Sequence, residues 1–295
     1  MRSIDPKDLS QPEFHRLMIG SIGPRPIAFA STVDAGGRVN LSPFSFFNVF
    51  GSNPPTLAFA PNNNRHGQKK HTLLNIEEVP EVVINIVNYD MVEQMSLASA
   101  EYERGVDEFV KAGFTPVPSE RVRPPRVAES PVSYECAVQQ VVTIGNGPGA
   151  ANLVICEVRL AHFRDDIFDE KGVIDQRRID LVGRMGGEYY CRAHGEALFE
   201  VARPQRGIGV DQLPAPIRNS RILTGSDLGK LATIDELPAR EEIVNFRQAD
   251  GIDDMFEEAR NGCQYLPDLL HTKAKQLLKE NRVREAWLVL LQDKK

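Results

Sequence analysis

Short runs of β-forming residues alternate with turn residues in the first part of the chain. From Pro26 the runs PIAFASTV, RVNLSPFSFF and TLAFA are separated by the turn segments DAGG and GSNPP. Glycines in the first turn allow the positive φ angles of a tight hairpin. The prolines of the second turn end a strand, because proline has no backbone N–H to donate to a ladder. This order predicts an antiparallel meander over residues 26–60.

A helix, a strand and a second helix are predicted after the meander. The Thr72 hydroxyl can cap the free N–H groups of a helix that begins there, and the run VVINIV from Val82 has the pattern of a buried strand. Asp90 and Glu93 have the spacing of a capping box, which predicts a short helix to about Ser99. Five prolines between residues 115 and 131 then indicate an extended surface connection.

The second half of the chain changes from strand patterns to helix patterns. The segments YECAVQQVVTIG and ANLVICEVRLAHF, joined by NGPG, predict a hairpin with two long strands. After Arg203 the sequence is irregular, and from Asp253 onward apolar residues recur at helical spacing. The final apolar run, residues 287–291, fits a strand or a buried helix equally well. One helical face is formed by Leu270, Ala274, Leu277 and Leu278.

Composition and charge narrow the classes of function. At 295 residues, with 41% hydrophobic and 26% charged residues, the chain has the composition of an ordinary globular protein. A net charge of -6 provides no positive field for nucleic acid or acidic lipid. No apolar stretch approaches the roughly 20 residues that span a bilayer. We therefore expect neither nucleic acid nor membrane partners. The absence of a signal-peptide pattern makes the cytoplasm the expected location.

Cysteine and histidine patterns supply no catalytic motif. The cysteines lie far apart without a C-x-x-C pair, and the histidines show no metal-ligand spacing. The motifs of zinc metallopeptidases, α/β-hydrolases and P-loop proteins are absent. A Ser-His-Asp triad assembled from distant segments stays open, although no local motif supports one. We expect free, buried thiols and no metal site, and we assign no catalytic residue from the sequence.

A basic segment, NNNRHGQKKHTLLN, leads into the predicted helix at Thr72. It contains Arg65, Lys69, Lys70 and His71. The unpaired N–H groups and the positive dipole end of a helix start favour an anion such as a phosphate, and cationic side chains add charge-assisted hydrogen bonds. The alternative is a solvated basic loop ahead of a surface helix.

Polar residues interrupt the aromatic strand RVNLSPFSFFN. Alternation along a strand places Asn40 and Ser42 on one face, with apolar neighbours on the other. Such polar groups can hydrogen-bond the edge of a flat ligand while an aromatic side chain covers its apolar surface. Serines that face solvent are the alternative interpretation.

Several segments, in this order, resemble the flavin reductase-like family. They are GPRPIAFASTVDAGGRVNLSPFSFFN, PPTLAFA, KKHTLLNIEEVPEVVINIV, SAEYERGVDEFVKAGFT, ESPVSYECAVQQV and RMGGEYY. Together they cover about residues 14–192. The resemblance implies a mainly β fold with added helices, namely a six-stranded antiparallel split β-barrel of Greek-key type that binds flavin mononucleotide (FMN). It also implies a homodimer with each flavin at the subunit interface.

The resemblance assigns one set of residues to the isoalloxazine ring of the flavin. Backbone and side chains around Thr32, Asn40, Ser42 and Ser45 would hold the ring. The residues themselves suggest that Phe46 or Phe47 covers its apolar surface. These positions fall on the polar and aromatic strand described above, so the two lines of reasoning point to the same segment.

A second set is assigned to the phosphate and to the side of the ring. Arg65, Lys70 and Thr72 would hold the phosphate, in agreement with the anion site inferred from the helix start. Arg25 and Pro26 would lie beside the ring. The PRP segment that contains them is equally consistent with a structural bend.

Further positions are assigned to the substrate side with less support from the pattern. Arg184 and Tyr189, in RMGGEYY, would close the pocket or contact the second substrate. His162 would lie on the nicotinamide side, although a histidine on an apolar strand is also well explained as a structural residue. Asp107 and Glu108 are interpreted as helix caps rather than as catalytic groups.

The implied activity is that of an FMN-dependent oxidoreductase that transfers hydride from NAD(P)H to flavin, which requires no side-chain acid or base. Nicotinamide and flavin would be its small-molecule partners, and a redox protein is an additional candidate. The alternatives are a non-catalytic FMN electron carrier of the flavoredoxin type and a split barrel that binds another phosphorylated cofactor. In this interpretation residues 1–203 form the flavin-binding domain. Residues 204–295 form a partly helical extension that packs on the barrel or on a dimer partner.

Overall fold

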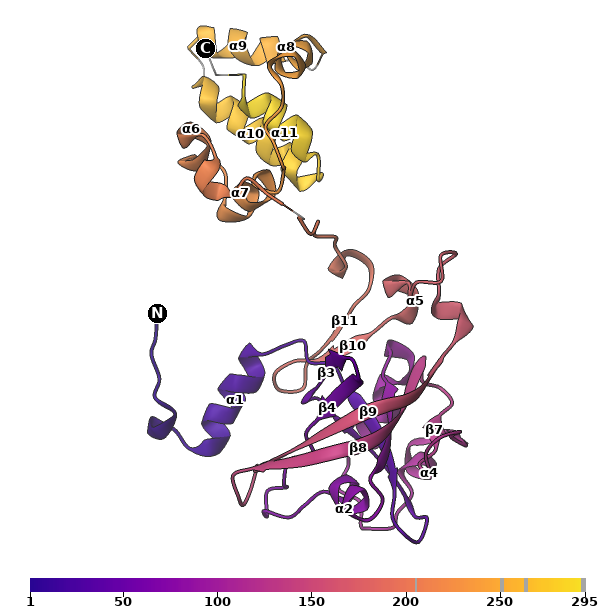
Figure 1. The fold of residues 1–295 in the computed structure, drawn as a ribbon. Helices are drawn as coiled ribbons and strands as arrows, with labels where there is room; N and C mark the ends of the chain where they lie inside the picture. Colours follow the sequence, from indigo (N-terminus) through magenta and orange to yellow (C-terminus); the bar gives the residue numbers. More distant parts are fainter. Residues whose placement is uncertain (205, 250–251, 263–264, 293–295) are drawn as a thin grey trace. The chain divides into compact units, whose positions relative to one another are not determined.

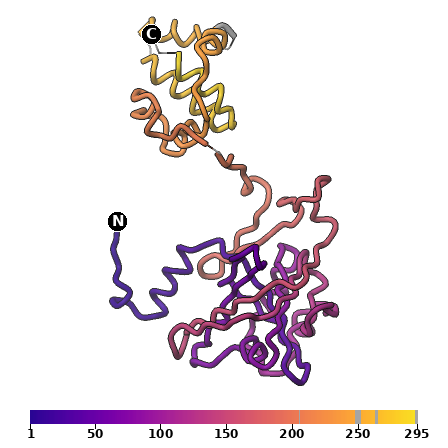
Figure 2. Tube along the Cα trace, viewed as in Figure 1, coloured from indigo at the N-terminus to yellow at the C-terminus, as the bar shows by residue number. Residues whose placement is uncertain are grey.

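The chain divides into two compact units, Met1–Phe199 and Glu200–Lys295 (Figure 1). The first unit is built around strands, whereas the second contains helices. Figure 2 follows the course of the chain from the N-terminus, in indigo, to the C-terminus, in yellow. Within the described ranges, no helix is long and apolar enough to cross a membrane. The computed structural model describes residues 1–204, 206–249, 252–262 and 265–292.

The first unit contains a seven-stranded antiparallel sheet. The predicted class, mainly β with added helices in a split barrel, is confirmed, but the main sheet has seven strands rather than six. In spatial order the strands are β2 (Val39–Phe44), β1 (Ala28–Val33), β5 (Glu81–Ile86), β8 (Val132–Ile144), β9 (Ala151–Phe163), β4 (Pro55–Phe59) and β3 (Phe47–Ser52).

The predicted strand RVNLSPFSFF ends as β2 at Phe44, and its last residue, Phe47, begins a further strand, β3, which was not predicted. These strands follow each other in sequence but lie at opposite ends of the strand order, so the prediction of one continuous meander was wrong. From Phe44 to Phe47 the chain spans at most about 10 Å. The sheet must therefore curl until its two edges approach each other, as a split barrel requires.

The long hairpin of β8 and β9 is confirmed, with Ile144 paired to Ala151 next to the turn. Apolar side chains of the central strands form a buried core under this hairpin. Cys136 and Cys156 are free and buried in that core. Cys263 lies outside the described residues.

Helices and small sheets cover the remainder of the first unit. The helices are α1 (Gln11–Ser21), α2 (His71–Glu78), α3 (Val92–Leu97), α4 (Glu108–Ala112) and α5 (Gln176–Ile179). The short strands pair as β6 (Pro116–Val117) with β7 (Arg126–Val127) and as β10 (Val182–Arg184) with β11 (Tyr190–Arg192). Short 3-10 turns are η1 (Pro6–Asp8), η2 (Tyr89–Met91), η3 (Asp165–Ile167) and η4 (Gly195–Ala197).

Two predicted helix caps were wrong and one is confirmed. Helix α2 begins at His71, and the buried Thr72 hydroxyl accepts a hydrogen bond from the Asn40 amide at 3.0 Å instead of capping the helix. Helix α3 exists, but the chain enters it through η2, so Met91 occupies the N-cap position and the predicted capping box does not form. Asp107 caps α4 by accepting from the Phe109 N–H at 2.9 Å.

The second unit contains helices from residue 215 onward, earlier than the predicted start at Asp253. Its first helices are short or strongly polar, which weakens their sequence periodicity. The predicted face of α10 is buried, and residues 287–290 are helical, with the Trp287 Nε1–H donating to the Leu231 carbonyl at 2.9 Å. That this unit packs on the barrel or on a dimer partner stays a prediction. Its elements are η5 (Val210–Gln212), α6 (Ala215–Arg218), α7 (Gly225–Leu231), α8 (Arg240–Ala249), α9 (Ile252–Arg260), α10 (Leu266–Lys279) and α11 (Val283–Leu290).

Candidate functional site

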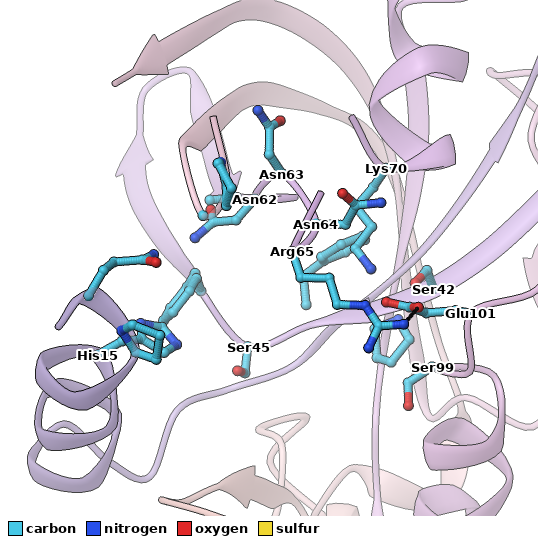
Figure 3. Close-up of a pocket in the computed structure, with 18 residues that line it drawn as sticks. His15, Ser42, Ser45, Asn62, Asn63, Asn64, Arg65, Lys70, Ser99 and Glu101 are labelled. Atoms are coloured by element: carbon cyan, nitrogen blue, oxygen red, sulfur yellow. Dashed lines mark hydrogen bonds and ion pairs between the residues drawn. The ribbon is translucent and has the colours of Figure 1, made fainter. Parts of the chain in front are cut away.

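A cavity of about 520 Å³, called the main cavity below, lies where the chain passes from β2 to β3. Its walls come from this crossing, from the loop after β4, from α1, from the loop after α3 and from the turn between β8 and β9. Figure 3 shows the polar side chains arranged around it. They are Gln11, His15, Ser42, Ser45, Asn62, Asn63, Asn64, Arg65, Lys70, Ser99 and Glu101.

A second, polar cavity of about 260 Å³ adjoins the main cavity. The two share Ser42, Asn64, Lys70, Ser99 and Glu101 as wall residues. The polar cavity continues to the start of α2 and to the loop that joins α3 and α4. The arrangement therefore provides a larger chamber with aromatic and polar walls and a smaller one at a helix start.

Cationic side chains gather at the junction of the two cavities. Lys70 is half-buried and lines both, and its ammonium group makes no hydrogen bond or ion pair with any described residue. Arg65 pairs with Glu101 at the edge of the main cavity, with 3.4 Å between guanidinium nitrogen and carboxylate oxygen (Figure 3). Burial, and then the charges of Arg104 and Lys70, hold the pKa of His71 below its usual value. The junction has a lysine available for an anion.

Asparagines build the loop that carries these cations, and the sequence reasoning missed their role. Asn64 Oδ1 accepts from the backbone N–H groups of residues 66 and 68, at 2.9 Å each. Asn63 donates to the Gly147 carbonyl at 3.1 Å and accepts from Asn152 at 3.0 Å, which ties the loop to the hairpin β8–β9. The run of three asparagines after a buried strand was the available signal, because asparagine stabilises turns with its own side chain.

An unpaired amide oxygen also faces this region. Asn62 lines the main cavity, and its buried Oδ1 has no hydrogen-bond partner within the described part of the chain. A buried acceptor without a donor costs about 1–3 kcal/mol. A ligand that donates a hydrogen bond here would recover that free energy.

The predicted ring and phosphate residues fall into two groups. Seven line the cavities: Asn40, Ser42, Ser45, Phe46, Arg65, Lys70 and Thr72. Asn40 lines only the polar cavity, next to its hydrogen-bond partner Thr72, so it lies at the helix start rather than with Ser45 and Phe46. Phe46 meets the His15 ring edge to face at 6.2 Å between centroids.

Three other predicted residues do not line the two cavities. Pro26 is exposed outside them, and the buried Thr32 hydroxyl accepts from the Asn75 amide at 3.2 Å. Arg25 is buried and donates to the carbonyls of Ile19 and Ile22, both at 2.6 Å, and its Nε lies 3.5 Å from the hydroxyl of Ser45, a wall residue of the main cavity. Arg25 therefore holds the end of α1 and also lies next to a residue of the main cavity, so that its place beside a bound ring stays a prediction.

The substrate-side predictions are placed in three different settings. His162 is bonded to the buried Glu135 at 2.7 Å and lies away from both cavities. Tyr189 is exposed. Arg184 lines a neighbouring cavity that adjoins Ser45. Of the three, Arg184 is the one that the fold brings close to the main cavity.

Glu108 and Glu101 are acidic residues of the site that the sequence reasoning did not assign. Glu108 lines the polar cavity, accepts from the Leu41 N–H at 3.0 Å, and burial raises its carboxyl pKa. It therefore fixes β2 between the two residues, Asn40 and Ser42, that line the polar cavity. No sequence motif marks such a contact, because it joins residues that are far apart in the chain.

Fold and site together define a split-barrel protein with two adjoining cavities beside a basic loop. The family model described as "Flavin reductase like domain" matches residues 21–182. The chain belongs to this family, so it is a flavin-related oxidoreductase by descent.

Three solved structures are similar to the first unit. Nitrilotriacetate monooxygenase component B from Bacillus cereus has 29% identity and a TM-score of 0.64, over 68% of this chain and 98% of that one. Pseudomonas fluorescens 2-nitrobenzoate 2-nitroreductase NbaA has 29% identity and a TM-score of 0.61, over 72% and 99%. A putative flavin reductase with a split barrel domain from Shewanella frigidimarina has 26% identity and a TM-score of 0.57, over 67% and 95%.

Proposed function

We propose that the protein is an FMN-dependent oxidoreductase of the flavin reductase type, with NADH or NADPH as hydride donor. The observation that carries the proposal is Lys70, a half-buried ammonium group without a counter-ion at the junction of two cavities. A phosphate dianion beside this group and the start of α2 would gain charge-assisted hydrogen bonds.

The remaining walls suit a flavin ring. Phe46 and Pro148 offer apolar surface, while Ser42, Ser45 and the unpaired Asn62 amide oxygen offer hydrogen-bonding groups. The main cavity, at about 520 Å³, is within the usual size range of small-molecule sites. This mixture of apolar surface and few polar groups fits FMN, and the adjoining polar cavity fits its phosphate.

Bound flavin would supply the hydride-accepting atom, so the chain needs no acid or base of its own. The side chains bind and orient. Lys70 fixes the phosphate, Ser42 and Ser45 contact the ring edge, and α1 with His15 covers the main cavity from one side. The absence of a catalytic motif in the sequence is consistent with this division.

The test is a binding titration followed by reduction. Purified protein should quench FMN fluorescence and bind FMN more tightly than riboflavin, which has the same ring and no phosphate. Under anaerobic conditions NADH or NADPH should bleach the oxidised flavin band. Equal affinity for FMN and riboflavin would show that the protein does not bind the phosphate, and would contradict the proposed phosphate site. Bound flavin that only dithionite reduces would identify an electron carrier instead.

We also propose that the protein is a homodimer. The edge strand β3 exposes Val49 and Phe50, at 65% and 69%, and α1 exposes Leu17 and Met18. Exposed apolar groups on an edge strand favour association. Val49→Glu combined with Phe50→Glu should convert a dimer to a monomer in light scattering coupled to gel filtration. A wild-type monomer would contradict the proposal.

A further inference from the structure

Two more cavities continue from the main cavity toward the hairpin β10–β11. A connecting cavity of about 220 Å³ shares Pro43, Ser45 and Ser99 with the main cavity. Ser45 and Ser99 lie on the side of the main cavity opposite Asn62 and Asn63 (Figure 3). An outer cavity of about 480 Å³ shares Ser96, Arg184 and Tyr190 with the connecting cavity. The three cavities therefore adjoin in sequence, from the main cavity outward.

Arg184 stands between the connecting and outer cavities with its charge uncompensated. The guanidinium donates to the Gly187 carbonyl at 2.7 Å and lies over the Tyr190 ring at 4.5 Å from its centroid. No carboxylate pairs with it among the residues that the structure describes. Its charge also lowers the pKa of Arg25, after the larger effect of burial. A half-buried guanidinium without a counter-ion is suited to bind phosphate oxygens.

The outer cavity has flat surfaces beside this charge. The Arg192 guanidinium lies over the Tyr89 ring at 3.7 Å, and its charge is satisfied by Asp180 through contacts of 2.8 and 2.6 Å. Tyr190 with Arg184 forms a second stack of the same kind. Aromatic rings and guanidinium planes both stack on purine bases. Arg192 therefore offers a stacking surface, whereas Arg184 offers a charge.

Two carboxylates occupy the outer cavity beyond Arg184. Glu93 and Glu188 line it and make no ion pair with any described residue. Carboxylates can accept hydrogen bonds from ribose hydroxyls, and they repel an additional phosphate placed beside them. Outward from the main cavity, the connecting cavity comes first, and Arg184 follows at the junction with the outer cavity. The outer cavity then adds the aromatic ring of Tyr89 and the two carboxylates.

We infer that the outer cavity binds the adenosine half of a pyridine dinucleotide that lacks the 2′-phosphate. The nicotinamide lies in the connecting cavity beside Ser45, the pyrophosphate binds Arg184, and the adenosine lies between Tyr89 and Tyr190. Glu93 and Glu188 bind its ribose and exclude the 2′-phosphate, so NADH is preferred to NADPH. This inference rests on the proposed function, because it deepens the identity of the hydride donor.

The test compares donors with and without the phosphates on the full-length protein loaded with FMN. NADH and reduced nicotinamide riboside carry the same hydride, but the riboside lacks both the pyrophosphate and the adenosine. Arg184→Gln should raise KM for NADH by about tenfold and leave KM for the riboside unchanged. The pairing of Arg184 with Arg25 uses backbone atoms only, at 2.9 Å, so the variant keeps that contact. Arg159→Gln, at an exposed position outside these cavities, is the matched control.

A binding measurement separates this inference from the proposed activity. By calorimetry, ADP should bind the oxidised FMN-loaded protein without displacing FMN, and Arg184→Gln should weaken that binding by about tenfold. Protein that is reduced by NADH but binds no ADP, or whose Arg184→Gln variant keeps the wild-type KM for NADH, overturns the inference and leaves the proposed function standing. Protein that binds FMN but is reduced by neither donor overturns both.

The last part of the test compares NADH and NADPH as hydride donors. Wild type should have a higher kcat/KM with NADH than with NADPH. Glu93→Gln combined with Glu188→Gln should raise kcat/KM for NADPH several-fold, because it removes two negative charges near the 2′-phosphate. A wild type that prefers NADPH would contradict the assignment of these carboxylates.

Discussion

The PRP segment, residues 24–26, and the basic loop, residues 62–70, differ in how their cationic side chains are used. Arg25 donates to the carbonyls of Ile19, Ile22 and Met185 at 2.6, 2.6 and 2.9 Å. Lys70, in the basic loop, lines two cavities, and its ammonium group has no partner within the described part of the chain. Arg25 therefore makes most of its hydrogen bonds to backbone carbonyls of the fold, with one longer contact to Ser45 at 3.5 Å, whereas the Lys70 ammonium group makes none with the described residues.

This difference teaches which cations of a sequence motif are available to a ligand. Both segments combine a cation with residues that restrict the backbone, and both resemble the family pattern, so the sequence assigned them to one cofactor. The two cations differ because, among the described residues, backbone carbonyls lie within hydrogen-bonding distance of the Arg25 guanidinium but not of the Lys70 ammonium group. The end of α1 leaves carbonyls without partners inside the helix, and a buried guanidinium next to them satisfies several at once.

The largest expected effect follows removal of the Arg25 side chain. Arg25→Ala leaves the carbonyls of Ile19, Ile22 and Met185 without their donor and detaches α1. We expect the free energy of unfolding to fall by about 3 kcal/mol, since several hydrogen bonds to a buried charge are lost. Urea denaturation measures it, with the exposed Lys171→Ala as control. A loss below about 1 kcal/mol would show that these bonds do not hold the segment.

The next effect is on ligand affinity rather than on folding. Lys70→Ala should weaken FMN binding by about tenfold to a hundredfold, which corresponds to the roughly 1.5–3 kcal/mol of a charge-assisted hydrogen bond. Riboflavin affinity and the unfolding midpoint should stay at the wild-type values. Fluorescence titration of the wild type and the variant with FMN and with riboflavin measures both affinities. A parallel loss for riboflavin would place Lys70 at the ring instead of the phosphate.

The parts of the fold that depend on neighbouring residues could be predicted from the sequence. The hairpin β8–β9, the strand at Val82 and the buried face of α10 follow from periodicity and turn residues, and the structure contains all three. The basic loop was found because its cations and the helix start are adjacent in sequence. In each case the determining contacts lie within a few residues.

The parts that depend on distant residues could not be predicted. The division of RVNLSPFSFF between two sheet edges follows from closure of the barrel, and nothing local requires it. Thr72 was interpreted as a cap because its partner Asn40 is 32 positions away. The backbone contacts of Arg25 and Glu108 could not be predicted either, since each side chain bonds backbone groups that the sequence does not bring near.

A smaller effect concerns Glu108, the buried acid that fixes β2. Burial raises its pKa, so it contributes stability that is fully present below the unfolded value, near 4.5, and is lost as pH rises through the folded value. Glu108→Gln keeps an oxygen for the Leu41 N–H but cannot ionise. Denaturation at a series of pH values from about 4, close to the usual carboxyl pKa, to about 8 should show the wild type losing stability relative to the variant as the pH rises. A constant difference over that range would contradict the raised pKa.

The smallest expected effect is at the mouth of the main cavity, where the basic loop meets Glu101. Both partners of the Arg65–Glu101 pair are exposed, at 75% and 58%, so the pair contributes at most about 1 kcal/mol to folding. Glu101→Gln should leave stability unchanged, yet raise FMN affinity a few-fold at low salt, because Arg65 and Lys70 then act on the phosphate without an opposing charge. Arg65→Gln in the same background should remove the gain. If the gain in FMN affinity persists without Arg65, Glu101 opposes the charge of Lys70 instead. The cation of the basic loop that binds the phosphate is then Lys70 rather than Arg65.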